Sequence, residues 1–167
     1  MEYYCVVETA AGYVALACCD GRLTRSTMPR PTPEEVLAEI AAGLDEGTVE
    51  DVGAFGELPN QLRLYFQGER VSFDSAQVDL SAYGPFHARV IRETRAIPYG
   101  TVVTYGELAR AVGSPGAARA VGAAMAANRT PIIVPCHRVI ASGGGIGGFS
   151  SGLDWKRKLL KIEGINI

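Results

Sequence analysis

The chain has 167 residues, of which 47% are hydrophobic and 20% charged, as in a soluble globular protein of one or two domains. This composition excludes a disordered, collagen-like or coiled-coil chain. No apolar run approaches the ~18 residues of a membrane span, and the residues after Met1 lack the charged start of a signal peptide. We therefore expect a cytoplasmic protein. The four cysteines make a poor disulfide framework, so a special cysteine is expected to be reactive rather than structural.

Charge divides the chain into opposite halves near Tyr83. Residues 1–83 carry five Arg against 14 Asp or Glu, a net charge of −9, whereas residues 84–167 carry eight Arg and three Lys against four acidic residues, a net charge of +7. This asymmetry suggests a polyanion-binding module joined to one that does not bind polyanions. The simpler alternative is that the basic charges form a solvated face whose partner is the acidic half across a domain interface. We expect two domains, 1–83 and 84–167.

The amino-terminal half predicts a small antiparallel sheet. Residues 3–8 and 13–19 have the composition of strands, and the turn dipeptide Asp20-Gly21 favours a hairpin into residues 23–28. Two helices are then expected. One begins at the capping box Thr32-Pro33-Glu34-Glu35 and runs to about Gly43 or Gly47, and the other covers residues 58–66. No chemistry can be assigned to this half, which we expect to be a scaffold.

The basic half predicts a helix-turn-helix pattern. After Gly84-Pro85, a helix is expected from Phe86 to about Arg95. A second capping box, Thr104 to Glu107, opens a short helix that stops at Gly113, and a further helix is expected over residues 116–128. Two short helices joined by a tight turn are typical of DNA-binding domains, although such pairs also occur in ordinary cores.

The second helix of this helix-turn-helix pair, over residues 116–128, has a single long polar side chain, Arg119, among mostly alanine residues. A helix that reads bases in the major groove needs several of Arg, Asn, Gln and Glu. Small side chains instead favour a shallow, sequence-independent contact in the minor groove, with Arg119 as the reaching group. The alternative is an alanine-rich packing helix with Arg119 as a surface charge.

A cysteine and a histidine meet at Cys136-His137, after a predicted short buried strand over residues 131–134. A thiolate is the nucleophilic form of cysteine, and an imidazole can take its proton. Because neighbours on an extended chain point to opposite faces, a bridging water is expected between them. A buried cysteine beside a hydrogen-bonded histidine, without catalysis, is the simpler alternative. The carboxylate that would fix the histidine tautomer stays open among Glu93, Glu107, Asp154 and Glu163.

Metal and nucleotide sites are discounted. The half that contains Cys5, Cys18 and Cys19 has no histidine, and a closed zinc site usually takes four ligands. The loop 143–152 is rich in glycine and can wrap a flat ligand, but it lacks the ending of a phosphate-binding loop. The final segment, 153–163, predicts a basic helix with its cations on the polar faces: Lys156, Arg157, Lys158 and Lys161.

Taken together, these residues resemble the O6-alkylguanine-DNA alkyltransferases, also called methylated-DNA-protein-cysteine methyltransferases. The resemblance covers nearly all of residues 84–164. It is carried by Pro135-Cys136-His137-Arg138-Val139, the run from Ala117 to Gly122, Asn128, the Gly-Gly-Phe-Ser-Ser-Gly loop, and the later Lys156, Leu159-Leu160 and Glu163-Gly164.

The resemblance implies an α/β (α+β) fold, with a small amino-terminal β-sheet and helix domain and a carboxy-terminal winged helix-turn-helix-like domain. It also implies a monomeric repair protein that binds double-stranded DNA in the minor groove and flips an alkylated base out of the duplex. The alkyl group of O6-alkylguanine, and of O4-alkylthymine, would pass irreversibly to the protein without a cofactor.

The same resemblance implies roles for individual residues. Cys136 would be the acceptor, His137 the water-mediated base and Glu163 the carboxylate that orients it, while Asn128 would tie the recognition helix to the active-site turn. In the duplex, Arg119 would fill the gap left in the stack, and Tyr105 would donate to the flipped base and help rotate its phosphate. Ser150 would donate to the alkylated oxygen, and the carbonyls of Cys136 and Val139 would accept from the amino group of the guanine. Met125 and Phe149 would form apolar walls, and Lys156 would support the site.

The sequence departs from the family pattern at three points. Arg129 follows Asn128 where a proline is common, which leaves the turn less rigid and could add a phosphate contact. Phe149 lacks the hydroxyl often found in the pocket, and the histidines of the zinc site of some relatives are missing, so no metal is expected.

Three other functions compete with repair. A non-repairing alkyltransferase-like protein would have tryptophan in place of Cys136. A helix-turn-helix transcription regulator would need base-reading side chains that the second helix lacks. A cysteine hydrolase acting on acyl groups would leave the basic half unexplained.

Overall fold

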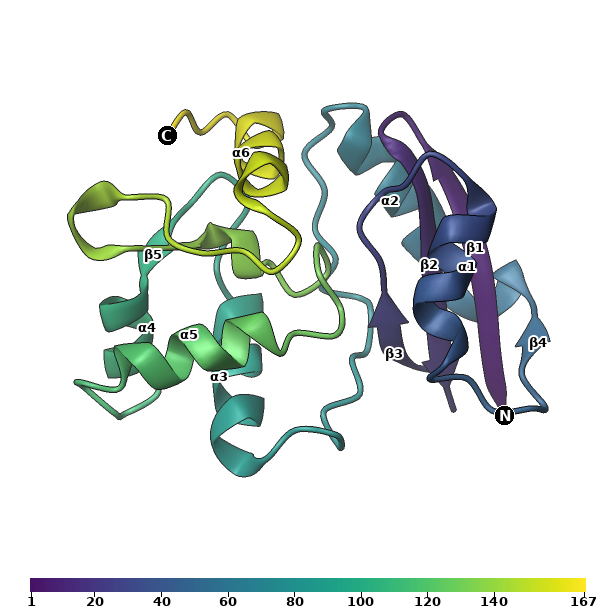
Figure 1. Ribbon diagram of the computed structural model, residues 1–167, viewed down its shortest axis with the longest axis horizontal. Helices are drawn as coiled ribbons and strands as arrows, with labels where there is room; N and C mark the ends of the chain where they lie inside the picture. The colour runs from purple at the N-terminus through teal and green to yellow at the C-terminus, as the bar shows by residue number, and fades with distance from the viewer. The chain divides into compact units, whose positions relative to one another are not determined.

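The computed structural model describes all 167 residues and divides into two compact units (Figure 1). The first unit contains residues 1–79 and 129–133, and the second contains residues 80–128 and 134–167. The division predicted from charge, 1–83 and 84–167, differs from this in two respects. The boundary lies four residues earlier, and the short segment 129–133 belongs to the first unit.

The first unit is built on a four-stranded sheet in the order β3-β2-β1-β4. Strands β1 (Glu2–Thr9), β2 (Gly12–Cys19) and β3 (Arg22–Ser26) are antiparallel neighbours, and β4 (Val49–Glu50) pairs in parallel with β1. The predicted hairpin is confirmed, because Asp20 and Gly21 turn the chain at φ angles of 49° and 77°. Aspartate and glycine are among the residues that tolerate this left-handed region.

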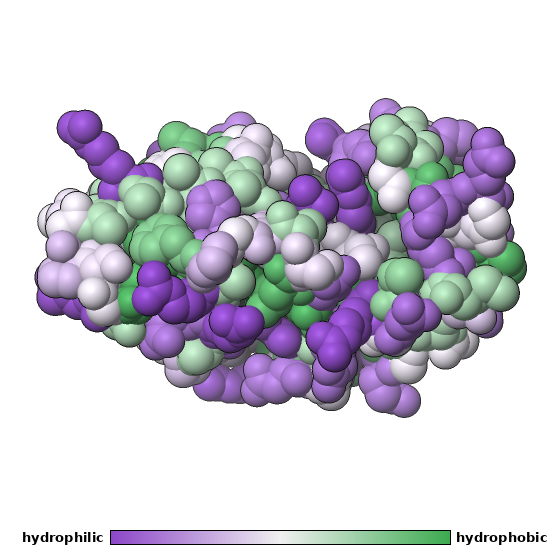
Figure 2. All heavy atoms as spheres, turned by 90° about the horizontal axis from the view of Figure 1, so that it is seen from below, coloured by the Kyte–Doolittle hydropathy of each residue, from purple (hydrophilic) through white to green (hydrophobic).

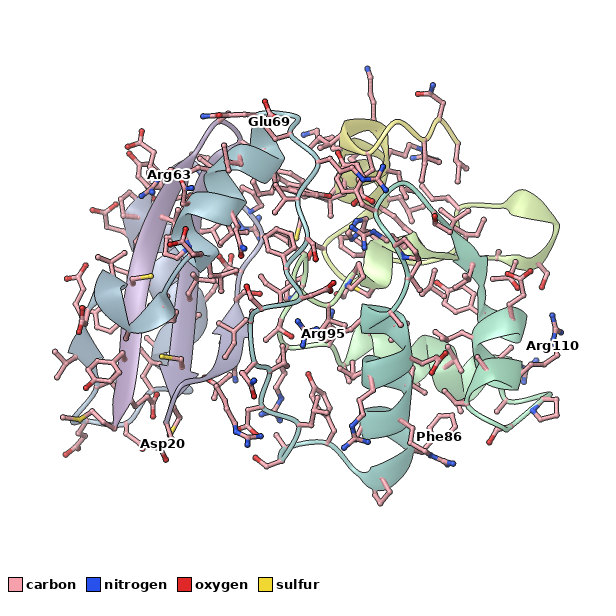
Figure 3. All side chains as sticks on the ribbon, turned by 180° about the vertical axis from the view of Figure 1, so that it is seen from behind. Asp20, Arg63, Glu69, Phe86, Arg95 and Arg110 are labelled. Atoms are coloured by element: carbon pink, nitrogen blue, oxygen red, sulfur yellow. The ribbon has the colours of Figure 1, made fainter.

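Helices cover the two faces of this sheet. The capping box predicted at Thr32 is present at the start of α1 (Pro33–Ala41), whose Val36 and Ile40 pack with Ala15 of β2. The second predicted helix is α2 (Leu58–Phe66), which follows the short 3-10 helix η1 (Val52–Phe55). Figure 1 shows α1 in front of the sheet, and Figure 3 shows α2, marked by Arg63, on the opposite face.

The segment 129–133 completes the first unit. The backbone N–H of Ser26, at the end of β3, donates to the carbonyl of Arg129 at 3.1 Å, and the Ser26 hydroxyl donates to the carbonyl of Pro131 at 2.9 Å. The short strand predicted over residues 131–134 is wrong, since the chain turns here and Ile132 has a φ of 76°. Left-handed geometry is rare for a β-branched residue, so surrounding contacts impose this turn.

The second unit contains four α-helices and a two-stranded parallel sheet. Helices α3 (Pro85–Arg95), α4 (Tyr105–Ala111) and α5 (Ala118–Ala126) pack on one another, and α4 and α5 form the predicted helix-turn-helix. The sheet, which the sequence did not predict, pairs β5 (Val103–Thr104) with β6 (Val139–Ile140). In Figure 1 the three helices lie below β5, and α6 (Leu153–Ile162) lies above it.

The predicted mixed α/β fold class is confirmed, with a sheet-based first unit and a largely helical second one. Hydrophilic and hydrophobic side chains intermingle on the face of the molecule shown in Figure 2. None of the helices is both long enough and apolar enough to span a membrane.

Candidate active site

Cys136 begins a short 3-10 helix, η2 (Cys136–Arg138), that leads directly into β6. Successive side chains of such a helix are about 120° apart. The sequence-based premise that Cys136 and His137 lie on an extended chain and point to opposite faces is therefore wrong. The bridging water inferred from that premise stays a prediction.

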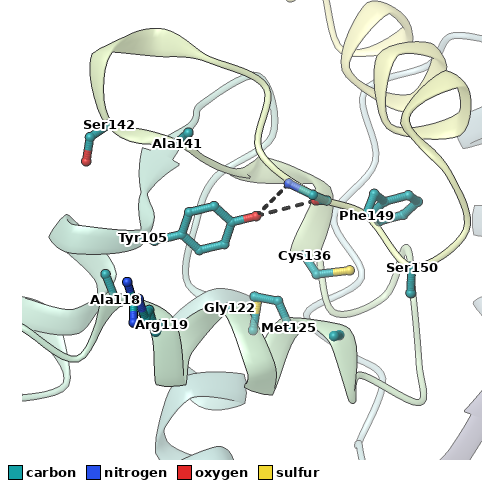
Figure 4. Close-up of a pocket in the computed structure, with 12 residues that line it drawn as sticks. Tyr105, Ala118, Arg119, Gly122, Met125, Cys136, Ala141, Ser142, Phe149 and Ser150 are labelled. Carbon is teal, nitrogen blue, oxygen red and sulfur yellow. Dashed lines mark hydrogen bonds between the residues drawn. The ribbon is translucent and has the colours of Figure 1, made fainter.

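A cavity of about 610 Å³ lies beside Cys136 within the second unit. Its volume falls in the range of ~300–1,000 Å³ that is typical of small-molecule sites. Arg119 lies at one end of the cavity, and Cys136, Phe149 and Ser150 lie toward the other (Figure 4). The wall comes from the start of α4, from α5, from the first residue of η2, and from the glycine-rich loop with its flanks: Tyr105, Ala118, Arg119, Gly122, Met125, Ala126, Cys136, Ala141, Ser142, Gly148, Phe149 and Ser150.

The structure selects Glu163 from the four carboxylates that the sequence left open for His137. His137 is fully buried, and its Nε2 lies 2.5 Å from Oε2 of Glu163. Burial lowers the pKa of the imidazole, and the positive charges of Arg138 and Lys156 add to that effect against the pull of Glu163. His137 is therefore neutral at pH 7. With Nε2–H donating to the carboxylate, Nδ1 is the ring nitrogen that can accept a proton.

Glu163 is held from several directions. Its Oε1 accepts from Nε of Arg138 at 2.8 Å and from the backbone N–H of Gly100 at 3.0 Å. Burial opposes ionisation of this carboxyl, but the hydrogen bond and the electrostatic attraction of His137, together with the hydrogen bonds from Arg138 and Gly100, outweigh it and lower its pKa to about 2. The carboxylate is thus ionised and fixed in place at all ordinary pH values.

The Cys136 thiol is 6% exposed, and burial raises its pKa above the ordinary value. A hydrogen bond from the Asn128 side chain and the positive charge of Lys156 act against this rise. Asn128 Nδ2 also donates to the carbonyl of Val134 at 3.1 Å. The resting sulfur is therefore a protonated thiol, with groups around it that favour the thiolate once a base removes the proton.

Lys156 was predicted on a polar face of the last helix, but its side chain is completely buried. Its Nζ donates to the carbonyls of Val139 at 2.6 Å and Gly148 at 2.9 Å. Burial lowers its pKa to about 8, so the ammonium remains mostly charged at pH 7. A buried cation of this kind is tolerated because it is hydrogen-bonded, and here it joins β6 to the glycine-rich loop.

Tyr105 touches the same loop. Its hydroxyl accepts from the backbone N–H of Gly148 at 3.2 Å and lies 3.4 Å from the Gly148 carbonyl (Figure 4). The neighbouring Gly147 has a φ of 74°, and a Cβ there would come within 2.8 Å of the Tyr105 hydroxyl. Glycine is needed at this position both for its backbone angle and for the close approach of the ring.

The structure brings most of the predicted site residues together. Tyr105, Arg119, Met125, Phe149 and Ser150 all line the cavity with Cys136. Asn128 and Lys156 act on the Cys136 sulfur, and Glu163 bonds the side chain of His137, the next residue in the chain. Val139 does not line the cavity, and its carbonyl is engaged by Lys156. Arg129 belongs to the first unit and does not line the cavity either.

The sequence interpretation gave no role to Arg138, Tyr99 or Gly100. Arg138 is 6% exposed and bonds both Glu163 and, through its guanidinium, the carbonyl of Ile97 at 2.7 Å. The Tyr99 hydroxyl donates to the carbonyl of Ile162, one residue before Glu163. An arginine inside an apolar run was the available signal for Arg138, whereas nothing local marks Tyr99 or Gly100.

Metal binding finds no support in the arrangement of side chains. The structure contains no group of three or more His, Cys, Asp and Glu residues placed to hold a metal ion. The side chains that the site does bring together are a thiol and a histidine that can act as its base.

Comparison with known proteins agrees with this geometry. Residues 2–80 match the family model of the 6-O-methylguanine DNA methyltransferase ribonuclease-like domain, and residues 85–165 match that of the DNA-binding domain. The methylated-DNA–protein-cysteine methyltransferase of Methanosarcina acetivorans is 49% identical over 163 residues, which cover 97% of this chain and 98% of that protein. The corresponding protein of Mycolicibacterium paratuberculosis is 41% identical over 163 residues, covering 98% and 93%.

A solved structure, Mycobacterium tuberculosis OGT in complex with DNA, superposes with a TM-score of 0.79 at 36% identity and covers 97% of this chain and 93% of that one. Fold and site together define a methyltransferase of the class that takes a methyl group from methylated DNA onto a protein cysteine. The chain belongs to the 6-O-methylguanine DNA methyltransferase family.

Proposed function

We propose that this protein repairs DNA directly, by moving the alkyl group of O6-alkylguanine onto Cys136, once per molecule. The observation that carries the proposal is the position of Cys136 at the wall of a cavity of about 610 Å³, beside a neutral histidine held by an ionised carboxylate. O4-alkylthymine is a second substrate, because it presents an alkylated exocyclic oxygen to the same sulfur. The reaction needs no cofactor.

The chemistry is a nucleophilic displacement. His137 takes the Cys136 proton at Nδ1, directly or through a water, and the thiolate attacks the alkyl carbon. A carbon–sulfur bond forms as the carbon–oxygen bond breaks, and the electron pair of the broken bond stays on the guanine. The guanine takes up the proton that His137 removed from the thiol and leaves the cavity as ordinary guanine. The product thioether has no easy leaving group, so the cysteine is not regenerated.

Groups on the cavity wall have the chemistry to recognise the extruded base. The Tyr105 hydroxyl and Ser150 donate to the base and its alkylated oxygen, and Met125 and Phe149 pack on apolar surface. The carbonyl of Cys136, on the cavity wall, and that of Val139, which does not line the cavity of the free protein, accept from the amino group. In the free protein, the carbonyl of Val139 already accepts from Lys156, and the carbonyl of Gly148 accepts from both Lys156 and the Tyr105 hydroxyl. The bonds that Val139 and Tyr105 make to the nucleobase are therefore shared with, or exchanged for, these contacts as the nucleobase enters.

DNA is held by the basic second unit through its helix-turn-helix. Helix α5 presents mainly alanine and glycine, which suits a close approach to the minor groove in any sequence, and the exposed Arg119 fills the stack behind the flipped base. Arg129 adds a phosphate contact. That a structural relative was solved in complex with DNA supports DNA binding. We propose a monomer acting in the cytoplasm, where a reducing environment suits four free thiols.

Mass spectrometry tests the proposal. The protein is mixed with a duplex carrying one O6-methylguanine, and its intact mass and peptides are measured. We expect one methyl group on Cys136 per protein molecule, with an equal amount of guanine restored. Cys136→Ala should bind the same duplex and gain no mass. Lesion binding by the unmodified chain without transfer would instead identify a non-repairing binder.

A further inference from the structure

Arg138 lies inside the second unit, with its charged group directed at the carboxylate of Glu163. The side chain is 7% exposed, Nε donates to Oε1 of Glu163 at 2.8 Å, and the guanidinium bonds the carbonyl of Ile97 at 2.7 Å. Its guanidinium carbon also lies 5.8 Å from the ring centre of Tyr99. The fork of an arginine can make such bonds in two directions at once, which a lysine cannot reproduce.

The negative charge of Glu163 beside His137 is balanced only if the positive charge of Arg138 is counted. Glu163 is fully buried and negative, and His137 on its other oxygen is neutral. The positive charge that compensates the carboxylate is therefore Arg138. Lys156 is the other cation near this group, and it faces the Cys136 sulfur and the carbonyls of Val139 and Gly148.

We propose that Arg138 is a positioning residue for alkyl transfer: by neutralising and fixing Glu163, it keeps His137 an uncharged base with Nδ1 free of a proton. The inference rests on the proposed function of Cys136 and His137. Arg138 touches neither the sulfur nor the cavity, since it is absent from the cavity wall, and it acts through Glu163.

Removing the guanidinium would leave a buried carboxylate with one unmatched negative charge. The nearest group able to neutralise it is His137, which would then hold a proton at both ring nitrogens. A protonated imidazole cannot accept the proton of Cys136. The variant would be slower than the wild type at neutral pH and would regain activity as the pH rises high enough to remove the extra proton.

The experiment measures the single-turnover rate of methyl transfer from duplex O6-methylguanine between pH 5.5 and pH 9. Arg138→Gln removes the charge, Arg138→Lys keeps it, and Arg22→Gln in the other unit is an exposed control. We expect the acid limb of the profile to move to higher pH by about one unit or more in Arg138→Gln. Arg138→Lys should restore the wild-type position of the limb, and the control should overlay the wild type.

The outcomes separate this inference from the proposed function. Absence of transfer in the wild type would overturn the proposed function itself. If Arg138→Gln were equally slowed at every pH, Arg138 would be a structural residue and the inference would fail. Should Arg138→Gln not fold, NMR titration of His137 in the wild type decides: a pKa below the ordinary value of 6.5 supports the inference, and a value at or above 6.5 overturns it.

Discussion

The side-chain amide of Asn128 donates to the main-chain carbonyl of Val134 at 3.1 Å, and so joins the second residue after α5 to the turn that carries the nucleophile. The same side chain hydrogen-bonds the Cys136 sulfur. One amide therefore fixes the position of the active-site turn and stabilises the thiolate that forms there. Residues 129–133, which lie between Asn128 and Val134 in the chain, belong to the first unit. The hydrogen bond thus joins the two points at which the chain leaves the second unit and returns to it.

Asn128→Ala should weaken both functions of the amide. A lost hydrogen bond to a buried carbonyl costs about 1–3 kcal/mol of unfolding free energy, and loss of the bond to sulfur should slow transfer by roughly tenfold. Urea unfolding and single-turnover assays measure the two effects. Asn60→Ala, at an exposed position of α2, is the matched control and should change neither. A variant with normal stability and normal rate would remove Asn128 from the site.

Arg119→Ala should affect a duplex that carries O6-methylguanine far more than the free base O6-methylguanine. Filling the stack is needed only when a base is extruded from DNA, and Arg119 lies at the end of the cavity away from Cys136 (Figure 4). We expect a loss of roughly tenfold or more on duplex, corresponding to about 1.4 kcal/mol, and little change with the free base. Transfer rates on the two substrates decide the matter, and equal losses would contradict this role.

Lys156→Met should make the Cys136 thiol less reactive. At pH 7 the buried ammonium is still mostly charged, and its field favours the thiolate. A rise of about one unit in the thiol pKa reduces the thiolate fraction roughly tenfold. Iodoacetamide labelling of the Cys136 peptide, followed by mass spectrometry without DNA, measures this. Lys158→Met, exposed on the same helix, should label like the wild type, and an unchanged rate in Lys156→Met would show that the cation does not act on sulfur.

Glu163 should make the stability of the protein sensitive to acid. Its folded pKa of about 2 lies below the ordinary 4.5, so its contribution is complete above pH 4.5 and is lost as the pH falls toward 2. His137, whose folded pKa is also lowered, adds a loss that begins below pH 6.5, because the unfolded chain takes up that proton first.

Glu163→Gln should therefore unfold more easily than the wild type at pH 7, by on the order of 3 kcal/mol, with the difference narrowing between pH 4.5 and pH 2.5. Urea unfolding across this range measures it. Glu46→Gln, an exposed carboxylate in the first unit, should follow the wild-type curve. A gap between Glu163→Gln and wild type that stays constant with pH would mean that Glu163 stabilises the fold by packing alone.

Elements fixed by local signals were predictable. The capping boxes at Thr32 and Thr104 start helices where expected, and Asp20-Gly21 turns the hairpin, because each signal acts within four residues. Cys136 and His137 could also be located as candidates, because they stand next to each other in one short motif, and the roles assigned to them stay predictions. What failed depends on distant partners. Residues 131–134 have the composition of a strand, but Ser26, over a hundred positions away, holds this segment in a turn.

Lys156 shows the same limit within the site. A lysine on a charged helix is expected to face water, and only the carbonyls of Val139 and Gly148 make its complete burial tolerable. Arg138 was visible as part of a motif, but its function depends on where Glu163 and Ile97 lie in the fold. Sequence patterns locate the chemistry, and non-local contacts decide the charge state in which it operates.

The membership of residues 129–133 in the first unit has a consequence for biosynthesis. Translation proceeds from the amino terminus, so the sheet and its two helices emerge early, yet the carbonyls that pair with Ser26 are made only after most of the second unit. The scaffold cannot reach its final form by itself on the ribosome. It is finished by the stretch of chain that immediately precedes the reactive cysteine, so that completion of the first unit and emergence of the nucleophile are nearly the same event.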